Sequence, residues 1–522
     1  MLLKNLIKNS PSKLRNLNIR GLASNSKNVK KGFIFFAIKG NRENGEDYIY
    51  EAIKKGAILI ICSKKFVNKN IKVNLIKTKN VNNILAHASS KFYSSKPKNI
   101  IAVTGTNGKT SVADFFYQIL EKNNFSVASI GTLGIKTKKR IVKTNLTSPD
   151  IITLHKNLEI LKKNKIDNVI IEASSHGLNQ SRLNNLNFKA GIFTNFSQDH
   201  LDYHKTMKAY LNAKLILFSK LLTKNSNIIT DSKIKIYSEL KKISKQRKLK
   251  IFDINTHDKK NIKLPKNLIG FFQIKNLSMA IIAARLCGLN VNEINKAIKK
   301  INVVEGRLNL IKKFQNNIKV FIDYAHTPEA LNTVLKSLKK TYNSKITLVF
   351  GCGGDRDFKK RPLMAKVAKS LCEKIYVTDD NPRYENPKKI RKQIISKLKG
   401  CNYFNFGDRS QAIKNAILNA EPNEVILVAG KGHESTQDYG YKRINISDKR
   451  IIKNLNLNKS IFNKKKQNYL FNSKILNKII KIKKFYKFNG IAIDTRKLKK
   501  DNLFLAIKGK NNDGNKFILK AI

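Results

Sequence analysis

The segment IAVTGTNGKTSV, residues 101–112, has the composition of a phosphate-binding loop. An apolar run that fits a buried strand stops at Gly105, and a helical pattern opens after Gly108. Glycines let the backbone approach an anion, which successive N–H groups and a helix N-terminus attract. The usual P-loop has four residues between its first glycine and the Gly-Lys pair, but here Thr106 and Asn107 are the only two. The segment therefore predicts a nucleotide site of a shorter type.

The three residues after the second glycine supply side chains for the chemistry. Lys109 can reach the β- and γ-phosphates of a nucleotide, and the hydroxyl of Thr110 or Ser111 can hold Mg²⁺. An ordinary glycine turn between a strand and a helix is the structural alternative. A Gly-Lys-Thr triplet directly after a buried strand favours the nucleotide site.

An acid and a histidine follow two later apolar runs. Glu172 lies near the end of the run NVIIEAS (168–174), and His200 follows the run AGIFTNF (190–196). The carboxyl ends of parallel strands meet at one edge of a sheet, so both side chains are expected beside the phosphate loop. A lone histidine is more often structural than a ligand, but this one shares the edge with an acid. We therefore expect Glu172 and His200 to contribute to a metal site.

These side chains need strands and helices that place them at one edge. Apolar, β-branched runs alternate with amphipathic stretches such as RPLMAKVAKSLC, which predicts an α/β fold of parallel sheets covered by helices. The expected strands are residues 99–105, 168–174, 190–196, 319–326, 345–352, 374–380 and 424–430.

Length and charge limit the classes of protein to consider. Single hydrophobic cores stop growing near about 250–300 residues, so a chain of 522 residues is expected to form about three domains. It carries 104 Lys and Arg against 35 Asp and Glu, a net charge of +69, which a nucleic-acid or anionic-membrane binder would explain. The lysines are scattered and arginine is sparse, which favours biased codon usage and no specific nucleic-acid partner.

The cysteines and apolar runs point to a cytoplasmic protein. The five cysteines form no Cys-x-x-Cys pair and no Cys/His metal spacing, so reduced thiols are expected. No apolar run reaches the ~18 residues of a membrane span. The first residues, MLLKNLIKNSPSK, lack the long apolar centre of a secretory signal.

The chain also repeats itself. Residues 21–53 align without a gap to residues 490–522, and both copies contain the segment FxAIKG in the form FFAIKG or FLAIKG. A fragment this small cannot bury a core of its own. We interpret residues 489–522 as a truncated second copy of the N-terminal domain, joined by a Lys/Asn-rich linker at 456–488.

Nine motifs resemble those of the Mur ligase family, in order and over about residues 15–452. They are GTNGKTS, EASSHGL, TNFSQDHLDYH, YLNAKLILF, VEGRLNLI, DYAHTPEAL, FGCGGDRDFKKRPLM, DDNPRYENP and AGKGHES. Mur and folylpolyglutamate ligases use the same short phosphate loop. The resemblance implies a three-domain α/β architecture. It comprises a small UDP-sugar-binding domain (1–95), a central P-loop-type ATP-binding domain with a parallel sheet (96–308) and a C-terminal Rossmann-like amino-acid-binding domain (309–455). The tail resembles the opening of the family member that adds D-Ala-D-Ala, as in a fusion of two neighbouring reading frames.

The resemblance implies an ATP-dependent amide ligase of peptidoglycan synthesis. A substrate carboxylate attacks the γ-phosphate to give an acyl phosphate and ADP, and an amine then displaces phosphate. Two anions meet in this step, so the site needs Lys109 and Mg²⁺, with two ions expected. The implied metal ligands are Thr110, Glu172, His200 and a carbamylated Lys214. From the residues alone, Lys214 is one surface lysine among many.

The resemblance also assigns binding residues. Contacts to ATP are implied for residues 105–111 and for Asn276, Arg307 and Asp323, with His326 expected to assist nucleotide binding or domain closure. Contacts to the substrate UDP-N-acetylmuramoyl-L-alanyl-D-glutamate are implied for Ser24, Ser26, Asn41, Arg42, Glu43, Thr147, Ser148, Ser174, Gln180 and Arg182. Departures from the family pattern occur at Asn25, Lys27, Asn44, Gln273 and Asn309.

The motif DNPR resembles the signature of family members that add meso-2,6-diaminopimelate. This amino acid has a second carboxylate at its far end, where lysine has only an ammonium group. Arg383 with Arg356 would therefore bind the carboxylate of diaminopimelate and repel the ammonium group of lysine. A proline turn with an arginine in solvent is the structural alternative. The implied contacts are Arg356, Asp380, Asn381, Pro382, Arg383, Gly430 and Glu434.

Three other functions stay open at this point. They are a lysine-adding Mur ligase, a folylpolyglutamate-type ligase and a basic nucleic-acid-binding protein with a decayed nucleotide site. The intact Gly-Lys-Thr triplet with Glu172, His200 and Lys214 speaks against the last. We expect a monomer that adds diaminopimelate to the D-glutamate of its UDP-linked substrate.

Overall fold

The computed structural model describes two units of the chain, Met1–Ile452 and Lys453–Ile522. The described residues are 1–40, 43–67, 71–144, 146–256, 265, 268–456, 471–472, 487–488, 490–507 and 513–521. Most of the expected linker at 456–488 lies outside them.

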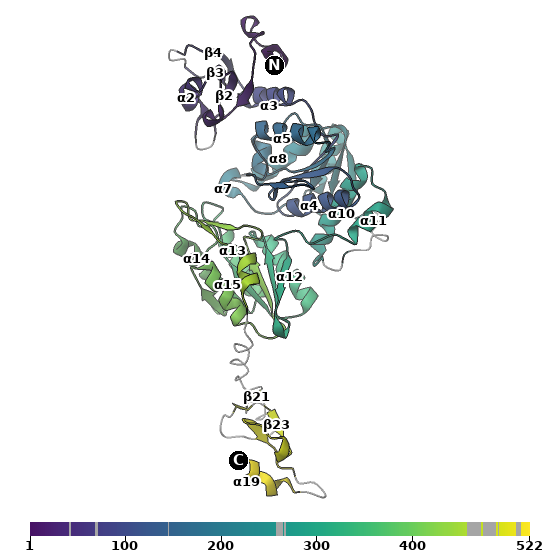
Figure 1. Cartoon of the computed structure of the whole chain (residues 1–522), viewed down its shortest axis with the longest axis vertical. Helices are drawn as coiled ribbons and strands as arrows, with labels where there is room; N and C mark the ends of the chain where they lie inside the picture. The colour runs from purple at the N-terminus through teal and green to yellow at the C-terminus, as the bar shows by residue number, and fades with distance from the viewer. Residues whose placement is uncertain are drawn as a thin grey trace. The chain divides into compact units, whose positions relative to one another are not determined.

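In the described part of the first unit, three large sheets are packed with helices (Figure 1), and a fourth sheet is the antiparallel pair β19 Thr436–Asp438 and β20 Arg443–Asn445. The three large sheets carry the rest of the fold. They lie within residues 21–78, 99–253 and 309–429, and most of their neighbouring strands are parallel. The predicted α/β fold is therefore confirmed. The domain boundaries drawn from the sequence remain a prediction.

The first sheet has four parallel strands in the order β1-β2-β3-β4. The strands are β1 Gly21–Ala23, β2 Phe33–Phe36, β3 Ala57–Ser63 and β4 Asn74–Thr78, and the helices are α1 Leu3–Leu6, α2 Ile49–Lys54 and α3 Val81–Phe92. Side chains alternate between two cores, since Phe36 packs in the cluster of α1 and α3 and Phe35 packs in the cluster of α2.

The second sheet has eight strands in the order β12-β11-β10-β5-β9-β6-β7-β8. They are β5 Asn99–Thr104, β6 Val127–Gly131, β7 Gly134–Lys136, β8 Ile141–Val142, β9 Asn168–Glu172, β10 Phe188–Phe193, β11 Leu222–Thr230 and β12 Lys250–Asp253. The two hairpins β6–β7 and β7–β8 are antiparallel, and the other pairs are parallel.

Helices cover both faces of this sheet (Figure 1). One face carries α4 Lys109–Lys122, α10 Phe271–Leu286 and α11 Val291–Ile298, and the other carries α5 Ile151–Lys163, α6 Ser175–Asn179, α8 Met207–Ile216 and α9 Tyr237–Arg247. In β5, Ile101 and Val103 face the first group while Ile100 and Ala102 face the second. Burial on both faces explains why this strand is a continuous apolar run rather than an alternating one.

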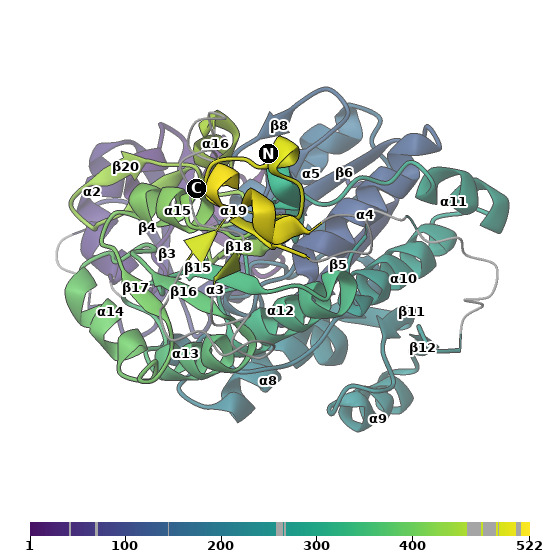
Figure 2. The same cartoon turned by 90° about the horizontal axis from the view of Figure 1, so that it is seen from below.

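The third sheet has six strands in the order β13-β14-β18-β15-β16-β17, and β13 alone among them pairs antiparallel. The strands are β13 Asn309–Lys313, β14 Lys319–Asp323, β15 Ile346–Phe350, β16 Lys374–Val377, β17 Tyr403–Asn405 and β18 Val425–Ala429. The helices are α12 Pro328–Tyr342, α13 Lys360–Leu371, α14 Pro387–Ile395, α15 Arg409–Leu418 and α16 Asp448–Asn454. Helices α12 and α13 lie side by side (Figure 2).

The second unit repeats the opening elements of the first. Strands β23 Gly490–Ala492 and β24 Asn502–Phe504 pair parallel with Gly490 opposite Asn502, as Gly21 lies opposite Phe33 in β1 and β2. The 3₁₀ helices Thr495–Lys497 and Gly514–Phe517 match Ser26–Asn28 and Gly45–Tyr48, and α19 Ile518–Ala521 matches the start of α2. The internal repeat is thus present in the structure as well as in the sequence.

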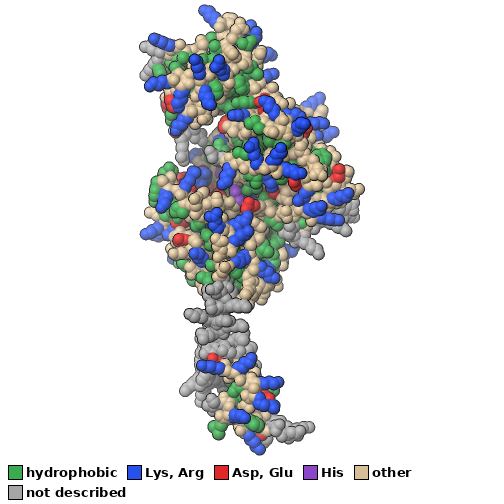
Figure 3. All heavy atoms as spheres, in the orientation of Figure 1, with side chains coloured by type: hydrophobic (Ala, Val, Ile, Leu, Met, Phe, Trp, Pro, Cys, Tyr) green, Lys and Arg blue, Asp and Glu red, His purple; other side chains and the backbone are tan. Residues whose placement is uncertain are grey.

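The surface and the thiols agree with the composition. Figure 3 shows Lys and Arg side chains spread over the visible face of the described residues. All five cysteines are free. Among the described residues, no helix is long and apolar enough to cross a membrane.

Candidate active site

The phosphate loop needs glycine at two positions for steric reasons. Gly105 has φ +138° and Gly108 has φ +89°, both in the region that disfavours other residues. A Cβ on Gly105 would lie 1.9 Å from the Thr194 hydroxyl oxygen, and one on Gly108 would lie 2.6 Å from Asn276 Oδ1. The loop between β5 and α4 is therefore packed against two other segments of the domain.

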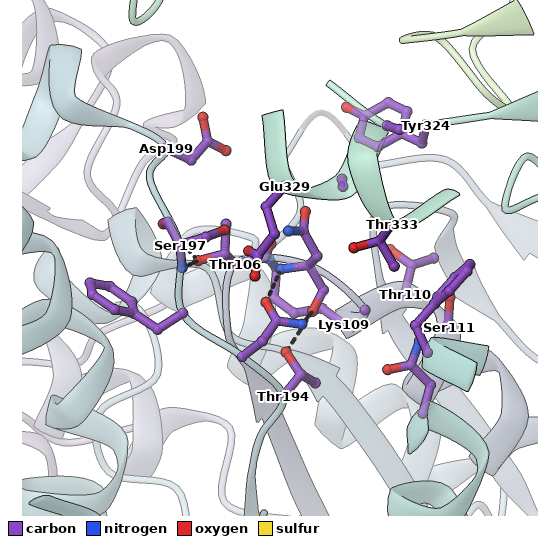
Figure 4. A pocket seen from close by; sticks show the side chains of 18 of the residues that line it. Thr106, Lys109, Thr110, Ser111, Thr194, Ser197, Asp199, Tyr324, Glu329 and Thr333 are labelled. Carbon is purple, nitrogen blue, oxygen red and sulfur yellow. Dashed lines mark hydrogen bonds between the residues drawn. The ribbon is translucent and has the colours of Figure 1, made fainter. Parts of the chain in front are cut away.

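The segment that follows β10 binds the phosphate loop through several hydrogen bonds. The Asn107 N–H donates to Asn195 Oδ1 at 2.8 Å, and the Thr194 hydroxyl donates to the Asn107 carbonyl at 2.5 Å. The Ser197 N–H donates to the Thr106 hydroxyl oxygen at 3.0 Å (Figure 4). Sequence analysis missed Thr194 and Asn195, although both lie in the TNF segment that closes a predicted strand.

Two lysines meet at one carbonyl of the loop. Lys109 Nζ and Lys214 Nζ donate to the Gly105 carbonyl at 2.9 Å and 2.7 Å, from α4 and α8. Burial lowers the pKa of Lys109, and burial with the nearby Lys109 lowers the pKa of Lys214 well below its usual range. Lys214 is only 1% exposed, so the structure corrects its description as a surface lysine.

Glu172 lies at the carboxyl end of β9 and accepts hydrogen bonds from two other elements. The Thr110 hydroxyl donates to its Oε2 at 2.9 Å, while Thr132 donates through its N–H at 2.9 Å and its hydroxyl at 3.0 Å. Arg307 also donates to the Thr110 hydroxyl oxygen at 3.1 Å. These contacts bring a cation, a hydroxyl and a carboxylate together beside the loop.

His200 lies next to a buried carboxylate that sequence analysis missed. Asp199 Oδ2 lies 3.4 Å from His200 Nε2 and 3.4 Å from His326 Nε2, and Lys360 Nζ lies 3.4 Å from Asp199 Oδ1. Although burial opposes it, Lys360 with the two histidines holds the pKa of Asp199 well below its usual range. Burial lowers the pKa of His200 well below its usual range, which favours a neutral imidazole. The motif TNFSQDHLDYH contains Asp199, but only the fold brings Lys360 to it.

The side chains beside the phosphate loop supply only some of the oxygen ligands that Mg²⁺ needs. Among the described residues, no three His, Cys, Asp or Glu side chains gather closely enough to hold an ion. The Thr110 hydroxyl and the Glu172 carboxylate, 2.9 Å apart, are hard oxygen ligands of the kind Mg²⁺ prefers. The ammonium group of Lys214 could not bind a metal ion, whereas a carbamate on Lys214 would offer two oxygen ligands. The set therefore suits Mg²⁺ when a nucleotide's phosphates and a carbamate supply the remaining oxygens.

One cavity of about 1310 Å³ collects most of the sequence-predicted residues. Its lining includes Thr106, Asn107, Gly108, Lys109, Thr110, Ser111, Thr147, Ser148, Glu172, Ser174, Arg182, His200, Lys214, Asn276, Arg307, Asp323, His326 and Arg356. Figure 4 shows the loop side chains at this cavity together with Tyr324, Glu329 and Thr333. Gly105, Gln180 and the expected amino-acid-binding residues other than Arg356 are outside this lining, as are Ser24, Ser26 and Glu43.

Arg307 is positioned by contacts to its guanidinium group and to its backbone carbonyl. Its guanidinium carbon lies 4.5 Å from the centre of the Tyr324 ring, and the buried Gln273 donates to its carbonyl at 3.2 Å. Asp323 accepts the N–H groups of Leu308 and Ala325 at 2.5 and 2.6 Å, and burial raises its pKa to about 6. Gln273, a departure from the family pattern, thus supports the backbone next to the cation.

The five expected substrate-binding residues of the central domain form one network. The Ser148 hydroxyl donates to the Glu172 carbonyl at 2.8 Å and accepts the Ser174 N–H at 2.9 Å, and Arg182 donates to the Ser148 carbonyl at 2.8 Å. Thr147 and Gln180 join it through Thr132 and Arg182. Ser148 is fully buried, so it can position its neighbours better than it can reach a ligand.

The structure describes some of the N-terminal residues that were expected to contact the UDP-linked substrate. Asn41 and Arg42 lie outside the described residues, and Glu43 is exposed. The Ser26 hydroxyl donates to Glu51 at 2.7 Å. Ser24 follows β1 and is partly exposed.

A second polar cluster lies at the carboxyl ends of β16 and β18. Asn381 donates to Glu434 at 2.9 Å, and Lys431, fully buried and missed by sequence analysis, donates to both of them at 3.0 and 2.9 Å. Gly430 lies against Asp380, because a Cβ there would be 2.6 Å from the Asp380 carboxylate. Pro382 is buried in the segment between β16 and α14.

Arg383 in this cluster is held by carbonyl groups. Its Nη1 donates to the Gly354 carbonyl at 2.7 Å, and its pKa is lowered by burial and by Arg356. Arg356 has a loose ion pair with Asp202 at 3.9 Å. The DNPR turn therefore holds its arginine against the protein, not free in solvent.

Comparison with known proteins gives three matching family models. They are described as the Mur ligase family catalytic domain (residues 18–93), the Mur ligase middle domain (103–284) and the Mur ligase glutamate ligase domain (306–432). A protein of Rickettsia bellii named UDP-N-acetylmuramoyl-L-alanyl-D-glutamate–2,6-diaminopimelate ligase is 39% identical over 462 residues. This match covers 83% of this chain and 95% of the relative.

Solved structures give the same result. A structure titled with that same ligase name has a TM-score of 0.60 at 27% identity, covering 89% of this chain and 99% of its own. The MurF ligase from Thermotoga maritima in complex with ADP has a TM-score of 0.56 at 20% identity, covering 84% and 97%, and shares the fold. The chain belongs to the Mur ligase family.

Proposed function

We propose that the protein is an ADP-forming ligase that joins meso-2,6-diaminopimelate to the D-glutamate of UDP-N-acetylmuramoyl-L-alanyl-D-glutamate in peptidoglycan synthesis. One observation carries the proposal: the phosphate loop, Glu172, His200, Lys214 and Arg307 line a single cavity. The relative of Rickettsia bellii bears the name of this activity, and this chain covers 95% of it.

The chain's own residues would perform three tasks. Backbone N–H groups of residues 105–111 and Lys109 would bind the nucleotide's phosphates. Arg307 would balance charge as a substrate carboxylate approaches the γ-phosphate and an acyl phosphate forms. Asn276 and Asp323 would orient the nucleotide. Mg²⁺, two ions in all, would neutralise the phosphate oxygens when bound at Thr110, Glu172, His200 and the modified Lys214.

Lys214 has the environment that carbamylation requires. The neutral amine attacks the carbon of CO₂ and forms an N–C bond, one C=O π pair becomes the carboxylate charge, and an N–H proton passes to water. Burial of Lys214 favours the neutral amine. The product carries a negative charge beside Lys109, the cation that now shares the Gly105 carbonyl with it. The modification would thus place a negative charge next to the Lys109 cation, where the unmodified Lys214 has a neutral amine.

Specificity for diaminopimelate rests on Arg383 and Arg356. Arg356 lies close enough to Arg383 to lower its pKa. The Arg383 guanidinium donates hydrogen bonds to the carbonyl oxygens of Gly354 and Asn381. A carboxylate bound between two cations relieves their repulsion, whereas the ammonium end of lysine would increase it. Asn381 and Glu434 would hold the amino group at the same end. We also propose that the protein acts as a monomer in the cytoplasm.

The test is ATP consumption with the UDP-linked dipeptide and either diaminopimelate or lysine in parallel. We expect turnover with diaminopimelate only, and a loss of roughly 10²-fold or more in Lys109→Ala and Lys214→Ala. Lys208→Ala, an exposed lysine on the same helix as Lys214, is the control.

Each alternative predicts its own result, in this assay or in a second one. Equal turnover with lysine would assign a lysine-adding ligase. Turnover with a folate and glutamate instead would assign a folylpolyglutamate-type ligase. Salt-sensitive DNA binding without any ligase activity would assign a nucleic-acid-binding protein.

A further inference from the structure

A second cavity, of about 540 Å³, lies away from the phosphate loop. None of its lining residues lines the first cavity. Helix α4 connects the two, because Lys109 at its start lines the first and Glu121 near its end lines the second, about 18 Å along the axis at 1.5 Å per residue. Val127, which begins β6, also lines it, so we call it the amino-end pocket.

The walls of the amino-end pocket are mainly apolar. They include Phe125, Val127, Ile135, Val142, Ile160 and Leu161. Val142 and Ile160 are 43% and 38% exposed, so a ligand that covered them would remove apolar surface from water. The volume lies within the roughly 300–1,000 Å³ of small-molecule sites.

The rim of the amino-end pocket is basic. Lys138, Lys139 and Arg140 line it from the turn between β7 and β8, and all three side chains are exposed. None of them has a carboxylate within ion-pair distance among the residues that the structure describes. Glu121 is the one acid in the described lining. The excess of two positive charges at the mouth of an apolar cavity is complementary to an anionic head on an apolar body.

We propose that the amino-end pocket binds a small amphipathic organic anion, with its apolar body against β6, β7 and α5 and its anionic group at Lys138, Lys139 and Arg140. We further propose that the hairpin β6–β7 relays occupancy to Glu172.

The hairpin has direct contacts at both of its ends. Thr132, directly after β6, donates two hydrogen bonds to Glu172, while Lys136 at the end of β7 pairs with the buried Asp114 of α4 at 2.6 Å. A ligand against Ile135 thus touches a strand whose neighbouring residues contact both Glu172 and the helix of the phosphate loop. Strand and helix are the kind of packed elements that carry coupling between sites.

The binding test uses 8-anilinonaphthalene-1-sulfonate, an aromatic body with one sulfonate, titrated by fluorescence into the full chain. Saturating Mg-ADP fills the nucleotide cavity. We expect one saturable site, with affinity at least tenfold weaker in the triple variant Lys138→Ala, Lys139→Ala, Arg140→Ala. Val142→Asp, which places a carboxylate on the wall, should weaken it as much.

The matched control is the triple variant Lys241→Ala, Lys242→Ala, Lys245→Ala on α9, which removes the same charge from exposed positions of the same domain. It should bind the probe like the unmodified chain. Equal weakening in the control, or unchanged affinity in the rim variant, would overturn the site. An unchanged ADP affinity on adding the probe to the unmodified chain would overturn the relay, for which we expect a shift of about fivefold or more.

Discussion

Individual side chains at this site are held mostly by residues from distant parts of the sequence. Thr110 and Glu172 are 62 positions apart, and Arg307 joins them from 197 positions beyond Thr110. Sequence patterns identify each of these residues next to its own strand or helix. They do not reveal partners such as Thr194, which contacts the phosphate loop, or Lys360, which contacts Asp199. Both are ordinary polar residues in the sequence, and only the fold brings them to these partners.

Thr194 tests the importance of the segment that holds the phosphate loop. Thr194→Val keeps the shape of the side chain but removes the hydroxyl that donates to the Asn107 carbonyl at 2.5 Å. A lost hydrogen bond of this kind costs about 1–2 kcal/mol, so ADP affinity should fall about five- to thirtyfold. Calorimetric titration measures it, with Thr341→Val, an exposed hydroxyl on α12, as the control. Unchanged affinity would show that the loop holds its shape without this bond.

The buried His155 leads us to expect that the folded protein loses stability in mild acid. His155 is fully buried in α5, its Nε2 lies 3.1 Å from the Asn184 carbonyl, and burial lowers its pKa to about 4. The unfolded chain, with a histidine pKa of about 6.5, takes up the proton first, so stability is lost as pH falls from about 6.5 toward 4. The free energy of unfolding lost through His155 over this pH range amounts to about 3 kcal/mol.

The variant His155→Gln isolates this contribution. Glutamine can still donate to the Asn184 carbonyl but does not titrate. Thermal unfolding at pH 7 and pH 4.5 should show a smaller drop in midpoint for the variant than for the unmodified chain. Equal drops would mean that His155 is already protonated in the folded protein.

At the scale of elements, the sequence predicts the strands well and the contacts between them poorly. The expected strands 99–105, 168–174 and 424–430 correspond to β5, β9 and β18 within two residues at each end. Burial on both faces makes these strands continuous apolar runs, which is a local signal. The order β12-β11-β10-β5-β9 is not local, and it decides that Thr194 lies beside Gly105.

The repeated 3₁₀ turns show what two departures from the family pattern do to the fold. Asn25 accepts the Lys27 N–H at 2.9 Å, as Asp494 accepts the Arg496 N–H at 3.0 Å in the second copy. Asn44 accepts the Glu46 N–H in the same way as Asp513 accepts the Asn515 N–H. Asparagine therefore keeps the cap that aspartate makes.

We therefore expect Asn25→Asp to change the free energy of unfolding by less than about 0.5 kcal/mol and Asn25→Ala to cost about 1 kcal/mol. Chemical denaturation of the full chain measures both. If Asn25→Ala were as stable as the unmodified chain, the turn would be fixed by the neighbouring strands β1 and β2 and not by its cap.

For the whole molecule, the division into two units decides where the chain can be shortened. The first unit ends at Ile452, which is fully buried, and Asp448 pairs with Arg409 at 2.8 Å with neither side chain exposed. Helix α16 is thus part of the first unit as far as Ile452, while the repeat at 490–521 belongs to the second.

Two deletions separate these roles. Removing residues 456–522 leaves the Arg409–Asp448 pair and Ile452 in place, so the main unfolding transition should be unchanged and ligase turnover should stay within about twofold. Removing residues 447–522 leaves Arg409 buried without its carboxylate, which costs about 3–5 kcal/mol and should lower the unfolding temperature and abolish turnover. Calorimetry and the ligase assay on both chains give the answer. If removal of residues 456–522 already caused a large loss of turnover, the repeated segment would contribute to the reaction, although it lies outside the unit that holds the cavity.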